Sequence, residues 1–504
     1  MLYATRVSEG SYLAAVSRTA AATEPTRSAF VRHVLLFSFA NLVALVCNGV
    51  LTFLLPRLLP MEAYGYYRLF ILYGGFAGAL HLGLLDGALL RWAARPRQRM
   101  KAELRSTLGF LLLQHGALLA PAMLVLVLVF RHQSWVFLAA AIVVYALVWN
   151  AATLGQFALQ ASKSFGFLSA LTVINPALLL AAVVALNHWR RLGLEALLIA
   201  YVGAWLIAGI AVWAVLLAEH PGHSSSARRV WQVGTYNIRA GWSVLLALLL
   251  TNIALSLDRL LVSVSFSIRD FAIYSLAANA LAVVYTVILS VSRVVFPYLS
   301  DGVGFEMKNR AYDWGEATLM SLWGLSVAGY FPLRVLVQRL LPNYVASLPI
   351  LRWLMLGTGM TAAIYILHAN YFRASLRQGR LLLGACIGLT AAAVFLAIAR
   401  RDGSLVAMSE AMVAGITVWW AANEFLLDDI TQRTLGDIAR TAVYLFGCGA
   451  AFLFAASTAS SAYGVLVYSV AFSALTGMTY GRSFRTLPRL RVQSVFAPTS
   501  VRPD

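Results

Sequence analysis

Stretches of about 20 apolar residues recur along almost the whole chain, and they constrain its fold more than any other feature. A helix of that length crosses the roughly 30 Å hydrocarbon layer of a bilayer. Runs bounded by charge, proline or glycine give fourteen candidate spans, at residues 34–55, 66–90, 108–130, 135–159, 167–186, 194–217, 242–266, 271–296, 317–337, 350–372, 381–399, 405–427, 441–457 and 463–480. The sequence therefore predicts an all-α polytopic membrane protein with about 14 transmembrane helices.

Composition and charge support this interpretation and set an orientation. Of the 504 residues, 61% are hydrophobic and 12% are charged, which excludes a soluble globular protein. The net charge of +19 is spread over the loops, and most basic residues fall on cytoplasmic segments when the N-terminus is placed inside. We therefore expect a multi-pass membrane protein with both termini in the cytoplasm.

A weak internal repeat suggests two halves. A shift of 207 positions pairs Tyr67 with Tyr274 and Asp86 with Arg293, and duplicated halves are common in secondary transporters. We expect a cytoplasmic tail at 1–33, an N-lobe of six helices at 34–217, a basic cytoplasmic linker at 218–241, a C-lobe of six helices at 242–427, a final helix pair at 441–480 and a cytoplasmic tail at 481–504.

Motifs for catalysis, nucleotide binding and metal binding are absent from the sequence. No loop is long enough for a folded soluble domain, and no Walker A, H-E-x-x-H, G-x-S-x-G or C-x-x-C motif occurs. The three cysteines, Cys47, Cys386 and Cys448, lie in apolar runs without paired spacing. We therefore expect a transporter rather than an enzyme, with no catalytic residue, cofactor or metal, and no nucleic-acid partner.

Polar side chains follow helical spacing on three of the expected spans. They are Ser38, Asn41, Asn48 and Thr52 on the first, Asn252, Ser256, Arg259 and Ser263 on the seventh, and Ser275, Asn279, Thr286, Ser290 and Arg293 on the eighth. Such stripes form hydrogen-bonded seams or line a water-filled lumen. Because two of them carry an arginine, we favour a lumen whose candidate substrate-binding residues are Arg259, Arg293, Asn252, Asn279, Asn41 and Asn48.

The two arginines suggest an anionic substrate. A guanidinium presents paired donors to phosphate oxygens and keeps its charge at any working pH. With 1.5 Å of rise per residue, Arg259 lies about 25 Å from the cytoplasmic end of its span and Arg293 lies near the cytoplasmic mouth. Two structural alternatives stay open: Arg259 pairs with its neighbour Asp258, or Arg293 extends to the membrane surface.

Three acidic residues within or near spans are candidates for ion coupling. Asp86, Asp258 and Glu410 would bind a proton or sodium ion if burial disfavours their charge. A structural role is the alternative for each of them. Glu424 is a fourth acid of the same kind, and Glu410 and Glu424 both lie near helix ends, where a carboxylate is ordinary. His368 is interpreted as structural, since it has no second ligand at metal spacing.

Two patches of the chain carry a family resemblance. The first holds Leu55-Pro56, Glu62-Ala63-Tyr64-Gly65-Tyr66 and Leu82-Gly83-Leu84 before Arg91, and the second holds Asp258-Arg259, Ile273-Tyr274-Ser275 and Phe296-Pro297. In the order and spacing of these fragments, the chain resembles the Wzx-type O-antigen and exopolysaccharide repeat-unit flippases of the multidrug/oligosaccharidyl-lipid/polysaccharide exporter superfamily. Fourteen helices depart from the commoner twelve and leave open a relation to lipid II flippases.

The resemblance implies two helical lobes around a central cavity and a specific cargo. That cargo is an undecaprenyl-diphosphate-linked oligosaccharide, moved from the cytoplasmic to the periplasmic leaflet for surface polysaccharide synthesis, including lipopolysaccharide. Alternating access of the lobes is the expected mechanism. The implied partners are this lipid-linked substrate, membrane lipids, a polysaccharide polymerase, and chain-length or export proteins.

Other functions remain as alternatives. A multidrug or cation antiporter with the same fold would use a buried acid in its lumen and few arginines. A membrane-embedded polysaccharide polymerase or ligase would usually carry a large outward loop, which this chain lacks. A scaffold without transport activity is the third alternative.

Overall fold

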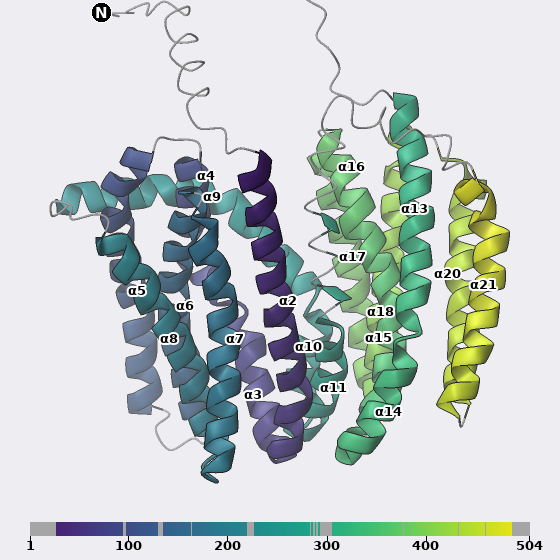
Figure 1. Ribbon diagram of the computed structural model, residues 1–504, viewed down its shortest axis with the longest axis horizontal. Helices are drawn as coiled ribbons and strands as arrows, with labels where there is room; N and C mark the ends of the chain where they lie inside the picture. The colour runs from purple at the N-terminus through teal and green to yellow at the C-terminus, as the bar shows by residue number, and fades with distance from the viewer. Residues whose placement is uncertain are drawn as a thin grey trace, which may run out of the picture. The chain divides into compact units, whose positions relative to one another are not determined.

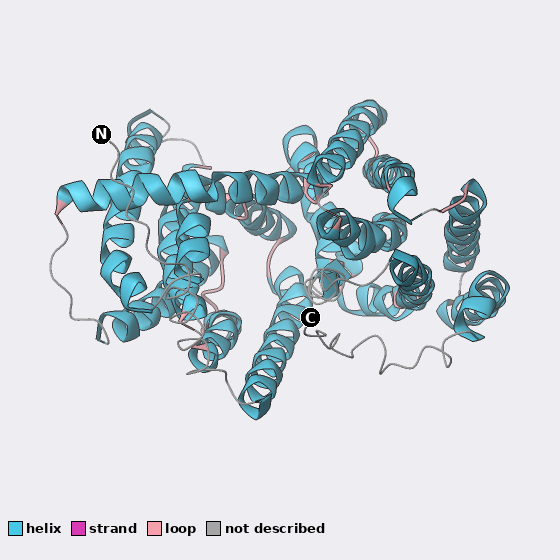
Figure 2. Cartoon of the chain, turned by 90° about the horizontal axis from the view of Figure 1, so that it is seen from above, coloured by secondary structure: helices cyan, strands magenta, loops and turns pink. Residues whose placement is uncertain are grey.

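Helices make up all the regular structure in the part of the chain that is described. The computed structural model describes residues 27–93, 97–129, 135–162, 164–218, 226–282, 284–285, 288, 291–292, 305–375, 377–431, 433–458 and 460–485. Within these ranges there is no β-strand, as Figure 2 shows. The chain is an all-α polytopic membrane protein, as the sequence predicts.

The first half of the chain forms long helices interrupted by short ones (Figure 1). They are α2 (Arg27–Leu58), α3 (Met61–Gly74), η1 (Ala77–His81), α4 (Leu84–Ala93), α5 (Arg97–Val129), α6 (Val136–Ala161), α7 (Phe165–His188), α8 (Leu194–Ala218), α9 (Ala227–Ala254), α10 (Leu257–Ser265) and α11 (Ile268–Ala280).

The second half continues in the same way. Its elements are α13 (Phe305–Val327), α14 (Tyr330–Leu340), η2 (Pro342–Tyr344), α15 (Ser347–Ala362), the π-helical segment η3 (Ala363–His368), α16 (Ala369–Ala374), α17 (Gln378–Ala399), η4 (Arg400–Asp402), α18 (Leu405–Leu426), α19 (Asp428–Thr431), α20 (Leu435–Ser457) and α21 (Ser461–Arg485).

Most of the expected spans are present. Twelve described helices are long and apolar enough to cross a membrane, and the number is thirteen if one bent pair counts as a span. The twelve overlap every expected span except the second, which is the bent pair, and the eighth, at 271–296, which lies partly outside the described residues; the overlap with the seventh is confined to residues 242–254. The thirteenth, expected to be short, is the 23-residue helix α20.

The second span is not the continuous helix that the sequence predicts for residues 66–90. α3 ends at Gly74, η1 follows, and α4 begins at Leu84, with a bend of 62°. Gly83 has a φ of +88°, a backbone conformation that is open to glycine at little cost. The apolar run hides this break because hydropathy does not register backbone conformation.

The seventh span also differs from the prediction for 242–266. α9 begins at Ala227, inside the segment expected to be a linker, and ends at Ala254. A separate short helix, α10, begins at Leu257. Figure 1 shows α9 crossing α4 and α5 rather than running alongside α5–α8.

Residue contacts divide the chain into two compact units. Unit 1 comprises residues 1–48, 77–191 and 196–246, and unit 2 comprises 49–76, 192–195 and 247–504. The break in the second span coincides with a boundary between units, because α3 belongs to unit 2 and η1 and α4 belong to unit 1. The lobe boundaries expected from the sequence stay a prediction.

The core of unit 1 lies between α4, α5, α6 and α8. Leu85 and Trp92 of α4 are buried there with Leu111 of α5, Leu154 of α6 and Val212 of α8. Since water is absent from a bilayer core, close packing and small residues hold such helices together. The packing around α4 therefore stabilises the inner part of this unit.

Glycines bring α4 and α9 into backbone contact within unit 1. A Cβ atom added at Gly87 would lie 1.9 Å from the carbonyl oxygen of Asn237, and one at Gly241 would lie 2.0 Å from that of Gly83. No side chain fits at either position without a shift of the backbone. Gly83, Gly87 and Gly241 therefore let α4 and α9 approach each other closely.

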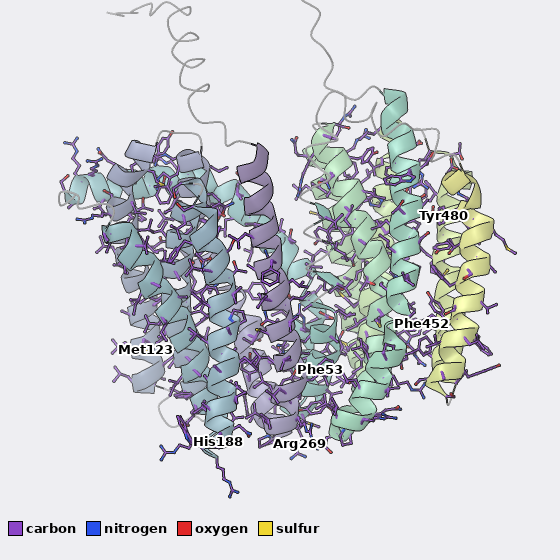
Figure 3. All side chains as sticks on the ribbon, in the orientation of Figure 1. Phe53, Met123, His188, Arg269, Phe452 and Tyr480 are labelled. Atoms are coloured by element: carbon purple, nitrogen blue, oxygen red, sulfur yellow. The ribbon has the colours of Figure 1, made fainter. Side chains whose placement is uncertain are left out.

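Unit 2 is built around the helix formed by α15, η3 and α16. In its most apolar stretch 83% of the residues are buried, a far larger share than in any other candidate span of the described residues, so this helix lies at the centre of the unit. The final pair, α20 and α21, packs through aromatic rings. Phe452, labelled in Figure 3, has its ring centroid 5.3 Å from that of Tyr330 on α14 and 5.8 Å from that of Tyr468 on α21.

α3 packs against α11 in unit 2. A Cβ atom added at Gly65 would lie 2.5 Å from the carbonyl oxygen of Ile268 and 3.3 Å from the Cβ of Ala272. At the exposed edge of this contact, the Nε of Arg269 donates to Glu62 over 2.9 Å. This helix pair positions the pocket described below.

The backbone contact between α4 and α9 can be tested with Gly241→Ala. The added methyl group overlaps the Gly83 carbonyl, so the helices must separate, and we expect a loss of about 1–3 kcal/mol of stability. The measurement is the thermal unfolding midpoint of the purified protein in detergent.

The matched control is Gly116→Ala on α5, where an added Cβ atom has nothing within 4 Å. Alanine favours a helix over glycine, so this variant should be as stable as wild type or slightly more stable. Equal midpoints for Gly241→Ala and Gly116→Ala would contradict the close approach.

Candidate functional site

A small pocket of about 140 Å³ lies in unit 2 among α3, the end of α9, α10 and α11. Its lining residues are Arg68, Ile71, Leu72, Gly75, Phe76, Asn252, Ser256, Arg259, Phe271 and Ser275. One water molecule needs about 10–15 Å³ of such a cavity, so the volume accommodates several waters or one small anionic group. Two guanidinium groups and three small polar side chains give it a basic, hydrogen-bonding character.

Arg259 is positioned by the interruption between α9 and α10. Its Nη2 donates to the carbonyl oxygen of Leu255 over 2.8 Å and to the Oγ of Ser256 over 3.0 Å. Because the helix is interrupted here, the Leu255 carbonyl needs a partner from outside the helical ladder. The Nη1 of Arg259 makes no hydrogen bond within the described part of the chain, and the side chain is 24% exposed.

Asp258 lies beside the pocket and is tightly held. The Tyr274 hydroxyl donates to its Oδ2 over 2.8 Å, and the backbone N–H of Arg259 donates to its Oδ1 over 2.7 Å. The Arg259 Nε is 3.9 Å from the same Oδ1. The alternative of an Asp258–Arg259 ion pair is therefore realised only as a long contact, and Arg259 makes its shorter bonds to Leu255 and Ser256.

Arg68 is the pocket residue that the sequence reasoning missed. It lies on α3 with Ile71 and Leu72, and Gly75 caps that helix; the spacing of 3, 4 and 7 residues from Arg68 places all three on one face. Its Nε is buried and has no hydrogen-bond partner among the described residues. In the sequence, Arg68 is visible as a lone arginine within an expected span, but no stripe of polar residues accompanies this arginine.

Asn252 and Arg259 meet in the pocket, as the polar stripe predicts, although they lie on two different helices. Asn279 lies on α11, where its amide donates to the Oγ1 of Thr52 on α2 over 2.8 Å. This bond is the interhelical seam that was the alternative for the polar stripes.

The remaining predicted substrate-binding residues lie elsewhere. Asn41 and Asn48 are exposed on the part of α2 in unit 1, and the Asn48 amide donates to the Ala44 carbonyl of its own helix over 2.9 Å. Arg293 lies outside the described residues. Its role stays a prediction.

The candidate ion-coupling acids do not gather at the pocket. Asp86 is buried in α4 of unit 1, with its Oδ2 3.8 Å from the Nε2 of His81. Glu410 is exposed on α18. Asp258 alone of the three is next to the pocket. Among the described residues, no group of three or more His, Cys, Asp or Glu side chains could hold a metal ion.

Comparison with solved structures identifies the fold. The chain is similar to the lipid II flippase MurJ in its inward closed conformation, with a TM-score of 0.68, 11% sequence identity, and coverage of 90% of this chain and 100% of that one. A mutant MATE transporter matches with a TM-score of 0.48 and 14% identity over 79% of this chain and 96% of that one. No protein-family model and no curated protein matches the sequence.

The similarity to MurJ establishes a shared fold at low sequence identity. The exporter superfamily expected from the sequence, and within it the Wzx-type flippases, stay a prediction.

The support that Tyr274 gives to Asp258 can be tested with Tyr274→Phe. Removing the hydroxyl leaves a buried carboxylate oxygen without its donor, which costs about 1–3 kcal/mol. We expect a lower thermal unfolding midpoint in detergent. Tyr463→Phe, at an exposed tyrosine on α21, is the control and should leave the midpoint unchanged; an equal effect of the two substitutions would show that the Asp258–Tyr274 bond contributes nothing.

Proposed function

We propose that this protein is a flippase for lipid-linked oligosaccharides that carry a diphosphate. The observation that carries this proposal is the pairing of Arg68 and Arg259 in one pocket. Guanidinium groups bind phosphate oxygens through two parallel N–H donors, and the Asn252 amide and the Ser275 hydroxyl add neutral hydrogen-bonding groups.

The charge balance of the pocket favours an anionic ligand. Two arginines line it, and the neighbouring Asp258 compensates for one positive charge at most. A charge within a membrane costs several kcal/mol unless it has a partner or water. A phosphate group would supply the missing negative charge and accept from the Arg259 Nη1 and the Arg68 Nε, which have no hydrogen-bond partner among the described residues.

The fold supports a cargo of this class. The chain shares its fold with a lipid II flippase over the whole length of that protein. In our proposal the cargo here is an undecaprenyl-diphosphate-linked oligosaccharide, moved from the cytoplasmic to the periplasmic leaflet of the bacterial inner membrane. Both termini would face the cytoplasm, and a polysaccharide polymerase with its export proteins would use the product.

Alternating access would move the headgroup while the lipid tail stays in the bilayer. Arg293, near the expected cytoplasmic mouth, would meet the diphosphate first, and Arg68 and Arg259 would hold it further along the path. Moving one elementary charge across a membrane potential of 100 mV changes its free energy by about 2.3 kcal/mol. The membrane potential could therefore bias the transport of a diphosphate without nucleotide hydrolysis.

An antiporter for drugs or cations is the second candidate, and the burial of Asp258 next to the pocket is the observation in its favour. A cation would have to displace the Tyr274 hydroxyl or the Arg259 backbone N–H from this carboxylate. The flippase accounts for both arginines, whereas the antiporter leaves them without a role.

Transport in proteoliposomes tests the proposal. With a fluorescent undecaprenyl-diphosphate oligosaccharide, wild type should move the lipid between leaflets, and Arg68→Ala or Arg259→Ala should lower the rate about tenfold or more, the equivalent of ~1.4 kcal/mol. Arg259→Lys should recover only part of the rate, because an ammonium group keeps the charge and loses the paired donors. Arg293→Ala should also be slower if Arg293 lies on the path.

The matched control is Arg401→Ala, at an exposed arginine on η4, and its rate should equal that of wild type. Wild-type protein that moves no oligosaccharide lipid but expels small cations in exchange for protons would replace the flippase with the antiporter. Transport that is unaffected in both Arg68→Ala and Arg259→Ala would remove the diphosphate from this pocket.

A further inference from the structure

A second cluster of charged side chains is buried in unit 2, away from the pocket residues. It contains Glu316 of α13, His368 at the end of η3, Glu424 of α18 and Arg433, which precedes α20. The side chains of these residues are between 0% and 3% exposed. Charged side chains are rarely buried to this degree unless they are paired with one another, as these are.

Arg433 holds three elements together. Its Nη2 donates to Glu316 over 2.8 Å, and its Nη1 donates to Glu424 over 2.5 Å. Its guanidinium also lies 5.0 Å from the ring centroid of Tyr312. Burial alone would lower the pKa of Arg433, but the negative charges around it raise the pKa above its ordinary value, so this residue stays positive.

The two carboxylates of the cluster differ in the number of groups that stabilise their negative charge. Glu424 accepts from Arg433 and, over 3.1 Å, from the Tyr312 hydroxyl. Its Oε1 also lies 3.0 Å from the Nε2 of His368. Glu316 accepts from Arg433, while the neighbouring Thr441 hydroxyl donates to the Asp437 carbonyl over 3.2 Å. Hydrogen bonds stabilise the charged form of a carboxylate. Glu424 is therefore the residue held as an anion, and Glu316 is the one that a proton neutralises more readily.

His368 completes the cluster on the side of Glu424. Its Nε2 lies 3.0 Å from the Oε1 of Glu424, and its Nδ1 is buried and has no hydrogen-bond partner among the described residues. It therefore contacts Glu424 and leaves Glu316 to Arg433. The cluster buries two carboxylates with one guanidinium, so that with both glutamates ionised one negative charge is in excess of the arginine.

Other ionisable groups surround Glu316 without compensating for that charge. Tyr312 and Asp313 lie on its own helix, and Tyr480 faces it from α21. Asp437 of α20 is half-buried and caps its own helix by accepting from Thr434. Arg440 is exposed and pairs with Asp437 over 3.5 Å. Within the described part of the chain, Arg433 is therefore the cation in direct contact with the two glutamates.

We propose that Glu316 is a proton-binding site that takes up and releases one proton, while Glu424 and Arg433 keep their charges. Protonation removes the negative charge in excess and leaves Arg433 facing a neutral carboxyl group, so the attraction between opposite charges in the Glu316–Arg433 ion pair is lost and only a hydrogen bond remains. The proton thus weakens the bond between α13 and the segment before α20.

The ligand of this cluster is a proton rather than a metal ion. Arg433 occupies the position between the two carboxylates that a cation would need. No set of three or more His, Cys, Asp or Glu side chains in the described ranges has an arrangement suited to a metal ion. The cluster also adjoins η3, and π-helical segments inside α-helices are frequent at functional sites.

Infrared difference spectroscopy between about pH 5 and about pH 9 tests this proposal on the purified protein without any lipid substrate. The measured signal is the carbonyl-stretch band of a buried protonated carboxyl group. We expect the band in wild type, its loss in Glu316→Gln, and its persistence in Glu424→Gln. In Glu424→Gln its midpoint should move to lower pH by about one unit or more, a tenfold change in proton affinity, because Arg433 then faces Glu316 alone.

Glu410→Gln, at the exposed glutamate of α18, is the matched control and should leave the band unchanged. If Glu316→Gln does not fold, wild type labelled with 13C-glutamate provides the test. The titrating carbonyl-stretch band must then shift in frequency, because it belongs to a glutamate side chain. The proposal is overturned if no titrating band shifts with the label, if Glu316→Gln keeps the wild-type band, or if Glu424→Gln abolishes it. None of these outcomes depends on the proposed flippase activity.

Discussion

Backbone polar groups inside a bilayer must find partners within the protein, and this constraint shapes the two broken helices of the chain. At the break between η1 and α4, the Asn150 amide donates to the Ala77 carbonyl over 2.9 Å and the Gln114 amide donates to that of Leu80 over 3.1 Å. At the break before α10, Arg259 donates to the Leu255 carbonyl. At these two breaks, polar side chains therefore supply hydrogen bonds to backbone carbonyls of the interrupted helices.

The pocket follows from that structural requirement. Because Arg259 has to reach back to Leu255, its guanidinium is fixed beside Ser256 and faces the lining of α3. One nitrogen satisfies the broken helix, while Nη1 has no hydrogen-bond partner among the described residues. An arginine can do both because its five donors point in different directions of one plane. Structural and ligand-binding roles of Arg259 are therefore compatible, and the two need not be weighed as alternatives.

The sequence predicts the helical class and most spans because length and hydropathy suffice for those, but it misses features that depend on backbone conformation or distant contacts. Gly83 was available as a signal for the break, yet the surrounding residues are as apolar as in any continuous span. Asn252 and Arg259 were found from their spacing. Arg68 was not, because it has no polar neighbour on its helix face. Glu316 and Arg433 are 117 residues apart, and only the folded chain brings them together.

The contact between α3 and α11 gives the weak sequence repeat a physical meaning. Glu62 and Arg269, which form an ion pair, are separated by 207 residues, the same shift that pairs Tyr67 with Tyr274. Gly65 approaches Ala272, which is again 207 positions further on. The segments that the shift equates therefore lie against each other in unit 2. The pocket beside them takes Arg68 from the first half of the chain and Arg259 from the second.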